Sequence, residues 1–281
     1  MSMLNGRVTP PGSDPGASAF PNLTVVAERV AAQAPAAVRL TDVSKVYGQG
    51  RGSLLALDKV SLSVRPGEFV CIIGASGCGK STLLSLVAGL DAATSGQIDT
   101  GGQQVTLMFQ EPALFPWLTA ARNVELALRA RGVPKARRRA RALELLEVVH
   151  LGGFGDKRPH ELSGGMRQRV ALARALSQDA DVLLMDEPFG ALDAMTRDLL
   201  HDELERICAE RTLSVLFVTH NVREAARLGD RVVVLSSRPG RVIEEYDVPR
   251  TGERRIDSHE VAELAATITD RLREEMVRHG S

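Results

Sequence analysis

The sequence predicts an α/β fold in which helices cover both faces of a mostly parallel β-sheet, with an antiparallel β subdomain and an inserted helical subdomain. The first observation is a strand-length apolar run at residues 69–73, which passes through a glycine-rich turn into a helical pattern at residues 80–90. The second is a series of short apolar runs separated by helical segments, as in a parallel sheet. These runs lie at residues 182–185, 215–218 and 232–235.

The regions around this core predict the domain organisation. Residues 1–36 hold five prolines among Gly, Ser and Ala, a composition that buries too little apolar surface to fold, so we expect a flexible extension. Residues 37–250 are expected to form the folded domain, which starts with the alternation typical of half-buried antiparallel strands. Within it, Ala, Leu, Arg and Glu dominate at helical spacing over about residues 111–180, which predicts the helical subdomain. Residues 251–281 are expected to be a C-terminal helical tail.

Composition narrows the classes of function. Lys plus Arg equals Asp plus Glu at 35 each, so no overall charge points to nucleic acid or to an acidic partner. No apolar run approaches the roughly eighteen residues that span a bilayer, and the N-terminus lacks the pattern of a secretory signal. Cys71, Cys78 and Cys208 lack CxxC spacing and nearby histidines, which disfavours disulfides and a zinc site. We therefore expect a protein of the reducing cytoplasm.

The glycine-rich turn carries the strongest functional pattern. Residues 74–81 match G-x-x-x-x-G-K-[ST] between a buried strand and a helix, which argues against an ordinary glycine turn and predicts a P-loop NTPase core of the RecA-like type. Backbone N–H groups there can converge on phosphate oxygens, Lys80 can contact the β- and γ-phosphates, and the Ser81 hydroxyl can ligate Mg²⁺. We assign the Cys78 thiol no chemistry, because the loop binds through its backbone. The predicted cofactors are ATP and Mg²⁺, and the residues expected to bind them here are Gly74, Ala75, Ser76, Gly77, Cys78, Gly79, Lys80, Ser81 and Thr82.

Residues 182–187 form an apolar strand that ends in two adjacent carboxylates. In a strand, neighbouring side chains point to opposite faces, so the two carboxylates can hold different roles. Asp186 is expected to contact the Mg²⁺ shell, and Glu187 to polarise the water that attacks the γ-phosphate. Taken alone, such a pair is better interpreted as a solvated surface feature. The phosphate loop upstream favours the catalytic interpretation.

A second glycine turn opens a helix at residues 162–169, which read Leu-Ser-Gly-Gly-Met-Arg-Gln-Arg. The Ser163 hydroxyl and the free N–H groups at Gly164 and Gly165 predict a second anion-binding helix start. With this turn, the chain resembles the ATP-binding subunits of ABC transporters, in which LSGG closes over the nucleotide held by a second copy. The resemblance implies a head-to-tail dimer with two shared ATP sites.

The same resemblance implies roles for four single residues. Tyr47 is similar to the aromatic residue on which adenine stacks. Gln110 is similar to the glutamine that senses Mg²⁺ and the attacking water and faces the membrane subunit. Asp193 matches the loop that couples the two sites, and His220 matches the histidine that contacts the γ-phosphate. Without the resemblance, these would be an exposed tyrosine, two loop residues and a structural histidine.

The matching elements follow the family's order over residues 38–242, with one departure at Asn221, where many members have Asp. The family implies two transmembrane permease subunits as partners, a solute-binding protein as an indirect partner, and no nucleic acid. It also implies a peripheral position on the cytoplasmic face of the cell membrane. The segments that resemble importers of the nitrate, sulfonate and taurine class are residues 113–117, 189–197 and 235–242.

The short span at residues 96–110 is most similar to aliphatic sulfonate members. The expected function is therefore ATP hydrolysis that energises import of aliphatic sulfonates or a related small oxyanion, such as nitrate or taurine. One alternative is an ABC ATPase that acts on nucleic acid or ribosomes, which usually has tandem cassettes or long coiled-coil insertions. A kinase with the same phosphate loop is another alternative, and it would leave LSGG and His220 without a role.

Two further patterns have plainer interpretations. The basic run at residues 135–141 begins an amphipathic helix without interleaved aromatic residues, so we expect a solvated face rather than a nucleic-acid or lipid contact. Apolar residues recur at helical spacing near the C-terminus, which predicts a helix that packs against the chain's own surface. These residues are Val261, Leu264, Ile268, Leu272 and Met276.

Overall fold

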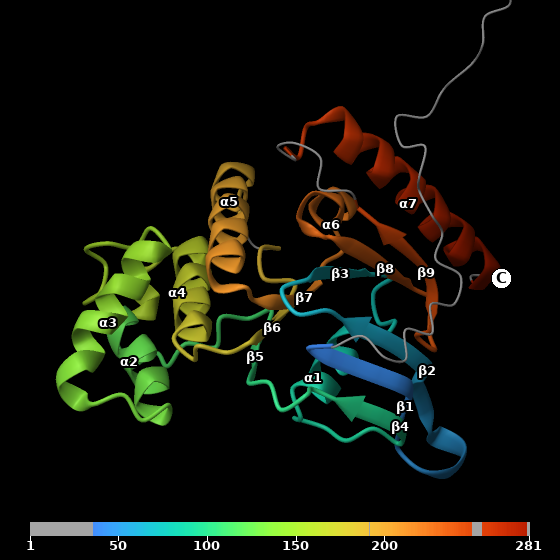
Figure 1. The fold of residues 1–281 in the computed structure, drawn as a ribbon, viewed down its shortest axis with the longest axis horizontal. Helices are drawn as coiled ribbons and strands as arrows, with labels where there is room; N and C mark the ends of the chain where they lie inside the picture. Colours follow the sequence, from blue (N-terminus) through green and yellow to red (C-terminus); the bar gives the residue numbers. More distant parts are fainter. Residues whose placement is uncertain (1–35, 191, 249–254, 280–281) are drawn as a thin grey trace, which may run out of the picture.

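The structure is a computed structural model that describes residues 36–190, 192–248 and 255–279 of the 281-residue chain. The expected flexible extension lies outside these residues except for Ala36. A six-stranded sheet in the order β5-β6-β7-β3-β8-β9 forms the centre, and a three-stranded sheet in the order β2-β1-β4 lies beside it (Figure 1). The central strands are β3 (Phe69–Ile73), β5 (Val105–Met108), β6 (Val182–Asp186), β7 (Ser214–Val218), β8 (Arg231–Leu235) and β9 (Val242–Asp247).

Five strands of the central sheet are parallel, as the apolar runs predict. β3 and β7 are buried along their whole length, because helices cover both faces of this sheet. β9 differs, since it pairs antiparallel with β8 at the edge. The sequence pattern missed β9 because two glutamates interrupt its apolar residues, and its burial is only partial.

The smaller sheet is antiparallel, as the alternation of its residues predicts. β1 (Val38–Tyr47) pairs with β2 (Leu54–Val64) on one side and with β4 (Ser95–Asp99) on the other. Helix α1 (Lys80–Val87) contacts both β2 and the strands β5, β6 and β7, so it lies between the two sheets. The apolar side chains of both sheets and of α1 form one continuous core cluster. This packing fixes the start of α1, where the phosphate loop ends.

A separate helical lobe extends from the sheet at the left of Figure 1. It contains α2 (Ala120–Ala130), α3 (Lys135–Val148) and α4 (Gly164–Leu176), all within the range expected for the helical subdomain. Val124, Leu128 and Leu145 are almost wholly buried where these helices meet. Two short 3-10 turns lie in loops, at Gly50–Gly52 and Pro159–Glu161.

The C-terminal part of the chain covers the far side of the sheet with α5 (Ala194–Arg211), α6 (Val222–Leu228) and α7 (His259–His279). Val261, Leu264 and Ile268 of α7 are buried in the main core cluster, and α7 packs on α6. The predicted packing of this helix on the chain's own surface is confirmed for these residues. No helix among the described residues combines the length and the apolar character needed to cross a membrane.

Candidate nucleotide-binding and catalytic site

The phosphate loop joins the end of β3 to the start of α1. Gly79 caps α1 with a φ of +105°, a backbone region that residues with a Cβ rarely adopt. A Cβ at this position would also lie 2.7 Å from Leu57 Cδ2 and 2.9 Å from the Ala56 carbonyl oxygen. Glycine is therefore required at the last turn of the loop by both conformation and packing.

Lys80 lies at the centre of the loop, with only 7% of its surface exposed. Its ammonium donates hydrogen bonds to the carbonyl oxygens of Gly74 at 2.9 Å and Ala75 at 3.1 Å. The first N–H groups of α1, those of Lys80, Ser81 and Thr82, have no acceptor within the helix. A buried ammonium beside free helix-start N–H groups suits a chain of phosphates. The chain's own residues thus fit the triphosphate that the motif predicts.

Cys78 lies in the same loop, and its side chain points inward. The residue is 1% exposed, and a Cβ added to Gly74 would lie 2.8 Å from its sulfur atom. Burial raises the pKa of the Cys78 thiol, with Lys80 opposing the shift. A protonated, buried thiol is a poor nucleophile. This geometry supports the expectation that Cys78 contributes only its backbone.

Asp186 ends β6 beside the start of α1. Burial raises the pKa of its carboxyl group, and a hydrogen bond with the Ser81 side chain opposes that shift. A carboxylate and a hydroxyl in contact offer the hard oxygen ligands that Mg²⁺ prefers. The donor set therefore fits Mg²⁺, with Ser81 and Asp186 as the side chains that would hold it.

Glu187 does not continue the strand, so the expected alternation of the two carboxylates is wrong. Its φ is +44°, a left-handed conformation that is uncommon for a residue with a side chain. Its backbone N–H donates to the Val218 carbonyl at 2.9 Å, which ties it to the end of β7. The Glu187 Oε2 atom then lies 3.0 Å from the Nδ1 atom of His220. Two residues that the sequence predicted separately thus form one pair.

The second anion turn lies against the loop that precedes α5. The Ser163 hydroxyl oxygen caps α4 by accepting from the Met166 N–H at 3.2 Å. A Cβ on Gly165 would lie 2.9 Å from Leu192 Cδ2, so glycine allows this close approach. Asp193 caps α5 by accepting from the Thr196 N–H at 2.9 Å. In the described part of the chain, no hydrogen bond joins this turn to the phosphate loop.

Tyr47 and Gln110 are the two remaining residues that the resemblance assigns to nucleotide or Mg²⁺. Tyr47 ends β1, is 38% exposed and donates its hydroxyl hydrogen to Asp91 Oδ2 at 3.2 Å. The Lys45 ammonium lies 4.9 Å from the centre of the tyrosine ring. Gln110 follows β5 with an exposed side chain, and its carbonyl accepts from Gln168 Nε2 of α4 at 3.3 Å. This bond links the Gln110 loop to the helix that Ser163 caps.

Comparisons with known proteins show which family the chain belongs to. Residues 57–190 match the protein family described as ABC transporter. The nitrate import ATP-binding protein NrtD of Synechocystis sp. is 47% identical over 223 residues, which are 77% of this chain and 84% of that protein. The chain belongs to the family of ABC transporter ATP-binding subunits. It is an ATPase of this family, which binds and hydrolyses ATP.

A second sequence relative and a solved structure are also similar to this ABC subunit. The taurine import ATP-binding protein TauB of Burkholderia thailandensis is 48% identical over 213 residues, which are 73% of this chain and 82% of that protein. A solved dimeric ATP-binding cassette, in a post-hydrolysis state bound to ADP and Pi, is 35% identical with a TM-score of 0.68. The match covers 76% of this chain and all of that chain. The predicted P-loop NTPase fold is confirmed.

The structure of this ABC subunit also shows residues that the sequence reasoning missed. Asn221 caps α6, because its side-chain oxygen accepts from the N–H groups of Arg223 at 3.1 Å and Glu224 at 3.3 Å. Its position before a helical run was a usable signal, since Asn is a favoured cap. Arg238 donates to the Gly77 carbonyl through Nε at 3.2 Å and Nη2 at 3.1 Å. No local pattern predicts this contact, because the two residues are 161 positions apart.

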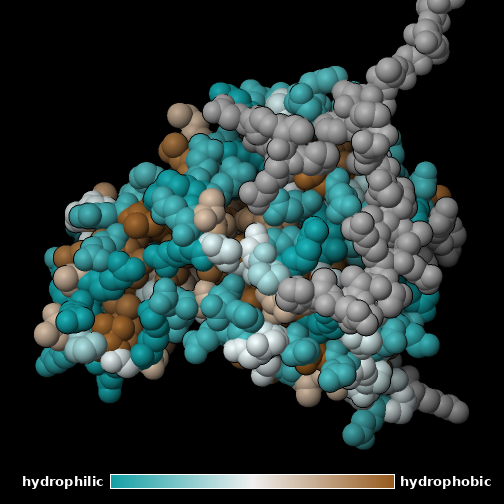
Figure 2. Space-filling view, in the orientation of Figure 1, coloured by the Kyte–Doolittle hydropathy of each residue, from teal (hydrophilic) through white to brown (hydrophobic). Residues whose placement is uncertain are grey.

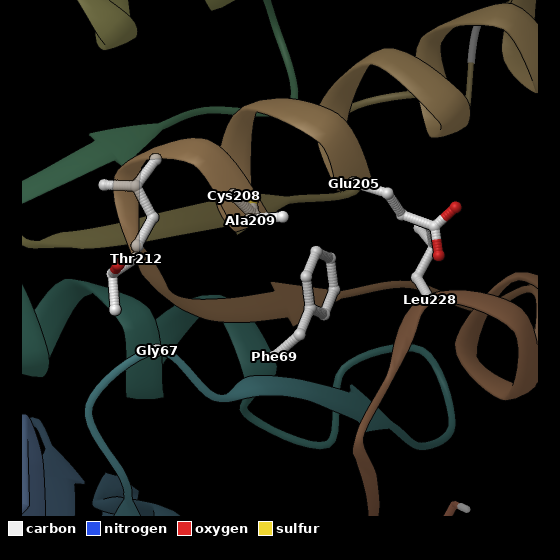
Figure 3. Close-up of a pocket in the computed structure, with 8 residues that line it drawn as sticks. Gly67, Phe69, Glu205, Cys208, Ala209, Thr212 and Leu228 are labelled. Atoms are coloured by element: carbon white, nitrogen blue, oxygen red, sulfur yellow. The ribbon is translucent and has the colours of Figure 1, made fainter. Parts of the chain in front are cut away.

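A pocket at the opposite end of β3 is not part of this site (Figure 3). Gly67 and Phe69, at the start of that strand, form one wall, and Cys208 and Thr212 of the α5 region form another. The phosphate loop follows the other end of the same strand. None of the site residues expected from the sequence lines this pocket.

Proposed function

We propose that two copies of this ABC subunit bind two Mg·ATP molecules in a head-to-tail dimer and thereby energise an importer of small oxyanions. The observation that carries the proposal is the division of the anion-binding groups between two surfaces. One surface holds Lys80 and the Glu187–His220 pair, and the other holds the Ser163 turn. No hydrogen bond joins them within the described chain, and in the proposed dimer each copy supplies one of the two surfaces to a site. The related cassette of known structure is a dimer.

The proposed chemistry relies on positioning and charge. Lys80 contacts the β- and γ-phosphates, and Ser81, Asp186 and Gln110 hold or sense the Mg²⁺ ion, which would neutralise phosphate charge. Glu187 orients and polarises the attacking water, and His220 contacts the γ-phosphate. On the opposed copy, Ser163 and the helix start behind it complete the site. Asp193 lies at the contact between the copies, and adenine stacks on Tyr47.

The helical lobe is the surface we assign to the permease partners. Figure 2 shows hydrophobic patches among polar surface over this part of the molecule. Trp117 is 67% exposed, and its ring centre lies 5.5 Å from that of Phe115, which is 37% exposed. Exposed apolar groups that cluster on one face mark an interaction surface more often than scattered ones do. The expected position is the cytoplasmic face of the membrane, with a solute-binding protein acting only through the permease.

The solute class is inferred from the relatives. Those named for nitrate and taurine import are 47% and 48% identical, and the bicarbonate transport ATP-binding protein CmpC of Synechococcus elongatus is 46% identical over 73% of this chain. The last match covers 33% of that longer protein. All three solutes are small oxyanions or carry one, so we propose this class, with aliphatic sulfonates included. The solute does not contact the ATP-binding subunit in this proposal.

Uptake measurements test the proposal. A strain that lacks this chain is given labelled nitrate, taurine, an alkanesulfonate or bicarbonate, and is complemented with the wild-type chain or with Lys80→Ala. We expect loss of uptake for one of these solutes, restored by the wild-type chain alone. Normal uptake of all four, together with co-purification of the chain with nucleic acid or ribosomes and no membrane protein, would contradict the importer proposal in favour of a non-transport ATPase.

A further inference from the structure

A series of buried polar contacts begins at Thr219, the residue before His220 of the Glu187–His220 pair. The Thr219 hydroxyl donates to Glu224 Oε2, and Glu224 Oε1 lies 2.7 Å from His201 Nε2. The Nδ1 atom of the same histidine lies 3.2 Å from Nη1 of Arg227. The four side chains belong to residues that are at most 5% exposed. Buried polar and charged groups destabilise a fold unless they are well paired, so this arrangement must be closely fitted.

The donors and acceptors in this series of hydrogen bonds have a fixed direction. The Arg227 guanidinium can only donate, so His201 Nδ1 accepts and the histidine proton sits on Nε2. His201 therefore donates to one oxygen of Glu224, while Thr219 donates to the other. Glu224 thus accepts on both oxygens. An amide in its place would put its NH₂ group against the His201 N–H, or against Thr219, whose hydroxyl would then have to accept instead of donate.

Two members of this series of contacts, Thr219 and His201, reach the catalytic segments. Thr219 immediately precedes His220, and its hydroxyl oxygen also accepts from the Asn221 N–H at 3.0 Å, which closes a turn around the histidine. The His201 ring meets the ring of Phe189 edge-on, with centres 5.3 Å apart. Phe189 lies two residues after Glu187. One buried histidine of α5 therefore supports the segments that carry both members of the pair.

We propose that His201 and Glu224 are positioning residues for ATP hydrolysis. They hold the segments of His220 and Glu187 in a fixed orientation relative to α5, the helix that Asp193 caps at the proposed dimer contact. This inference rests on the proposed roles of Glu187 and His220. Neither positioning residue contacts the phosphate loop through a hydrogen bond in the described chain, so their loss should affect turnover and leave ATP binding nearly unchanged.

Glu224→Gln tests the proposal, because its NH₂ group either faces the His201 N–H or forces the Thr219 hydroxyl to reverse from donor to acceptor, although that oxygen already accepts from the Asn221 N–H. We expect the kcat of ATP hydrolysis to fall about tenfold or more, since small displacements of reacting groups are costly. The Kd for a fluorescent ATP analogue should change by less than about threefold. His201→Gln alone should be mild, because its NH₂ group can still donate to the carboxylate.

The double variant His201→Gln with Glu224→Gln provides a rescue. The amide carbonyl introduced at position 201 can accept from the NH₂ group introduced at position 224. The amide carbonyl at position 224 is then free to accept from Thr219, so most of the kcat should return. Such strong non-additivity is the mark of residues that act together.

A second comparison covers the case in which Glu224→Gln does not fold. Thr219→Ser keeps the hydroxyl that donates to Glu224, whereas Thr219→Val removes it and keeps the shape of the side chain. We then expect Thr219→Ser to retain most of the kcat and Thr219→Val to lose it, with the Kd for the ATP analogue nearly unchanged in both. Equal kcat for these two variants would overturn the proposal.

Glu68→Gln is the matched control. Glu68 is 4% exposed and lies just before β3, at the end opposite the phosphate loop, where it pairs with Arg65 at 2.9 Å. We expect this variant to lower the Tm without lowering kcat. The proposal is overturned if Glu224→Gln keeps full kcat, if the double variant is no better than Glu224→Gln, or if Glu68→Gln loses as much kcat. A Glu187→Gln variant assayed beside them separates the positioning role of His201 and Glu224 from the catalytic role of Glu187. Full ATPase activity of Glu187→Gln would refute the catalytic role itself.

Discussion

The Glu187 carboxylate and the His220 ring lie 3.0 Å apart at the carboxyl ends of neighbouring strands. β6 and β7 are adjacent in the central sheet, and β3, which leads into the phosphate loop, pairs with β7 on its other side. The carboxyl ends of parallel strands share one edge of a sheet, so the three loops that follow these strands meet there. Strand order thus brings together residues from positions 74 to 220 of the chain.

Replacing Glu187 by Gln should separate ATP binding from ATP hydrolysis. The amide keeps the size of the side chain but is too weak a base to activate water, so we expect turnover to fall about 100-fold or more with little change in ATP affinity. Phosphate release and binding of a fluorescent ATP analogue measure the two effects. Glu144→Gln is the control, because Glu144 is exposed and pairs only with Arg141 at 2.7 Å among the described contacts. Full turnover in Glu187→Gln would refute its role.

The sequence predicted the parts of this site that are contiguous in the chain. The phosphate loop at residues 74–81 and the strand that ends at Asp186 carry their signals locally, in glycine spacing and apolar runs. The contact of Glu187 with His220 depends on which strands are neighbours, and no local pattern contains that order. The conformation of Glu187 was also mispredicted, because its bond to the Val218 carbonyl overrides the extended backbone that its apolar neighbours favour.

Replacing Lys80 by Ala should weaken ATP binding itself. The ammonium is the one side-chain charge within residues 74–81, and a charge-assisted hydrogen bond contributes about 1.5–3 kcal/mol, so we expect the Kd for ATP to rise about 10- to 100-fold. Calorimetric titration with Mg·ATP measures this. Lys157→Ala is a suitable control, since Lys157 is exposed and pairs with Glu161 at 3.2 Å. An unchanged Kd in Lys80→Ala would count against the assignment of the loop.

Asp186 should make stability and Mg²⁺ binding respond oppositely to pH. Because burial raises its pKa, the folded chain keeps a proton that the unfolded chain has already lost at the same pH. The contribution of Asp186 to stability is therefore greatest in acid and falls as the pH rises from the ordinary aspartate pKa through the raised value. Mg²⁺ needs the carboxylate form, so Mg²⁺ affinity instead falls as the pH drops through the raised pKa.

The variant Asp186→Asn tests the predicted direction of the effect of the Asp186 charge on stability and on Mg²⁺ binding. The amide removes a half-buried charge, so the nucleotide-free variant should have a higher Tm than the wild-type chain at neutral pH, while its Mg²⁺-dependent turnover is lost. Thermal unfolding without nucleotide and ATPase assays over a range of Mg²⁺ concentrations provide the two measurements. A variant that is less stable at neutral pH, or that keeps its turnover at the usual Mg²⁺ concentration, would contradict this account.

The two roles of Ser163, as a helix cap and as a contact to the opposed phosphate, can be separated by a pair of variants. Ser→Ala at a helix cap costs about 1 kcal/mol, whereas Ser→Gly costs a few tenths. Both variants lose the hydroxyl, so both should lose turnover and ATP-dependent dimerisation, measured by light scattering in the Glu187→Gln background. Only Ser163→Ala should lower the free energy of unfolding appreciably. Thr119→Ala is the control, because Thr119 caps α2 by accepting from the Arg122 N–H at 3.3 Å, outside the site. It should lose stability and still dimerise, whereas dimerisation by Ser163→Gly at the wild-type ATP concentration would show that the hydroxyl makes no contact across the dimer.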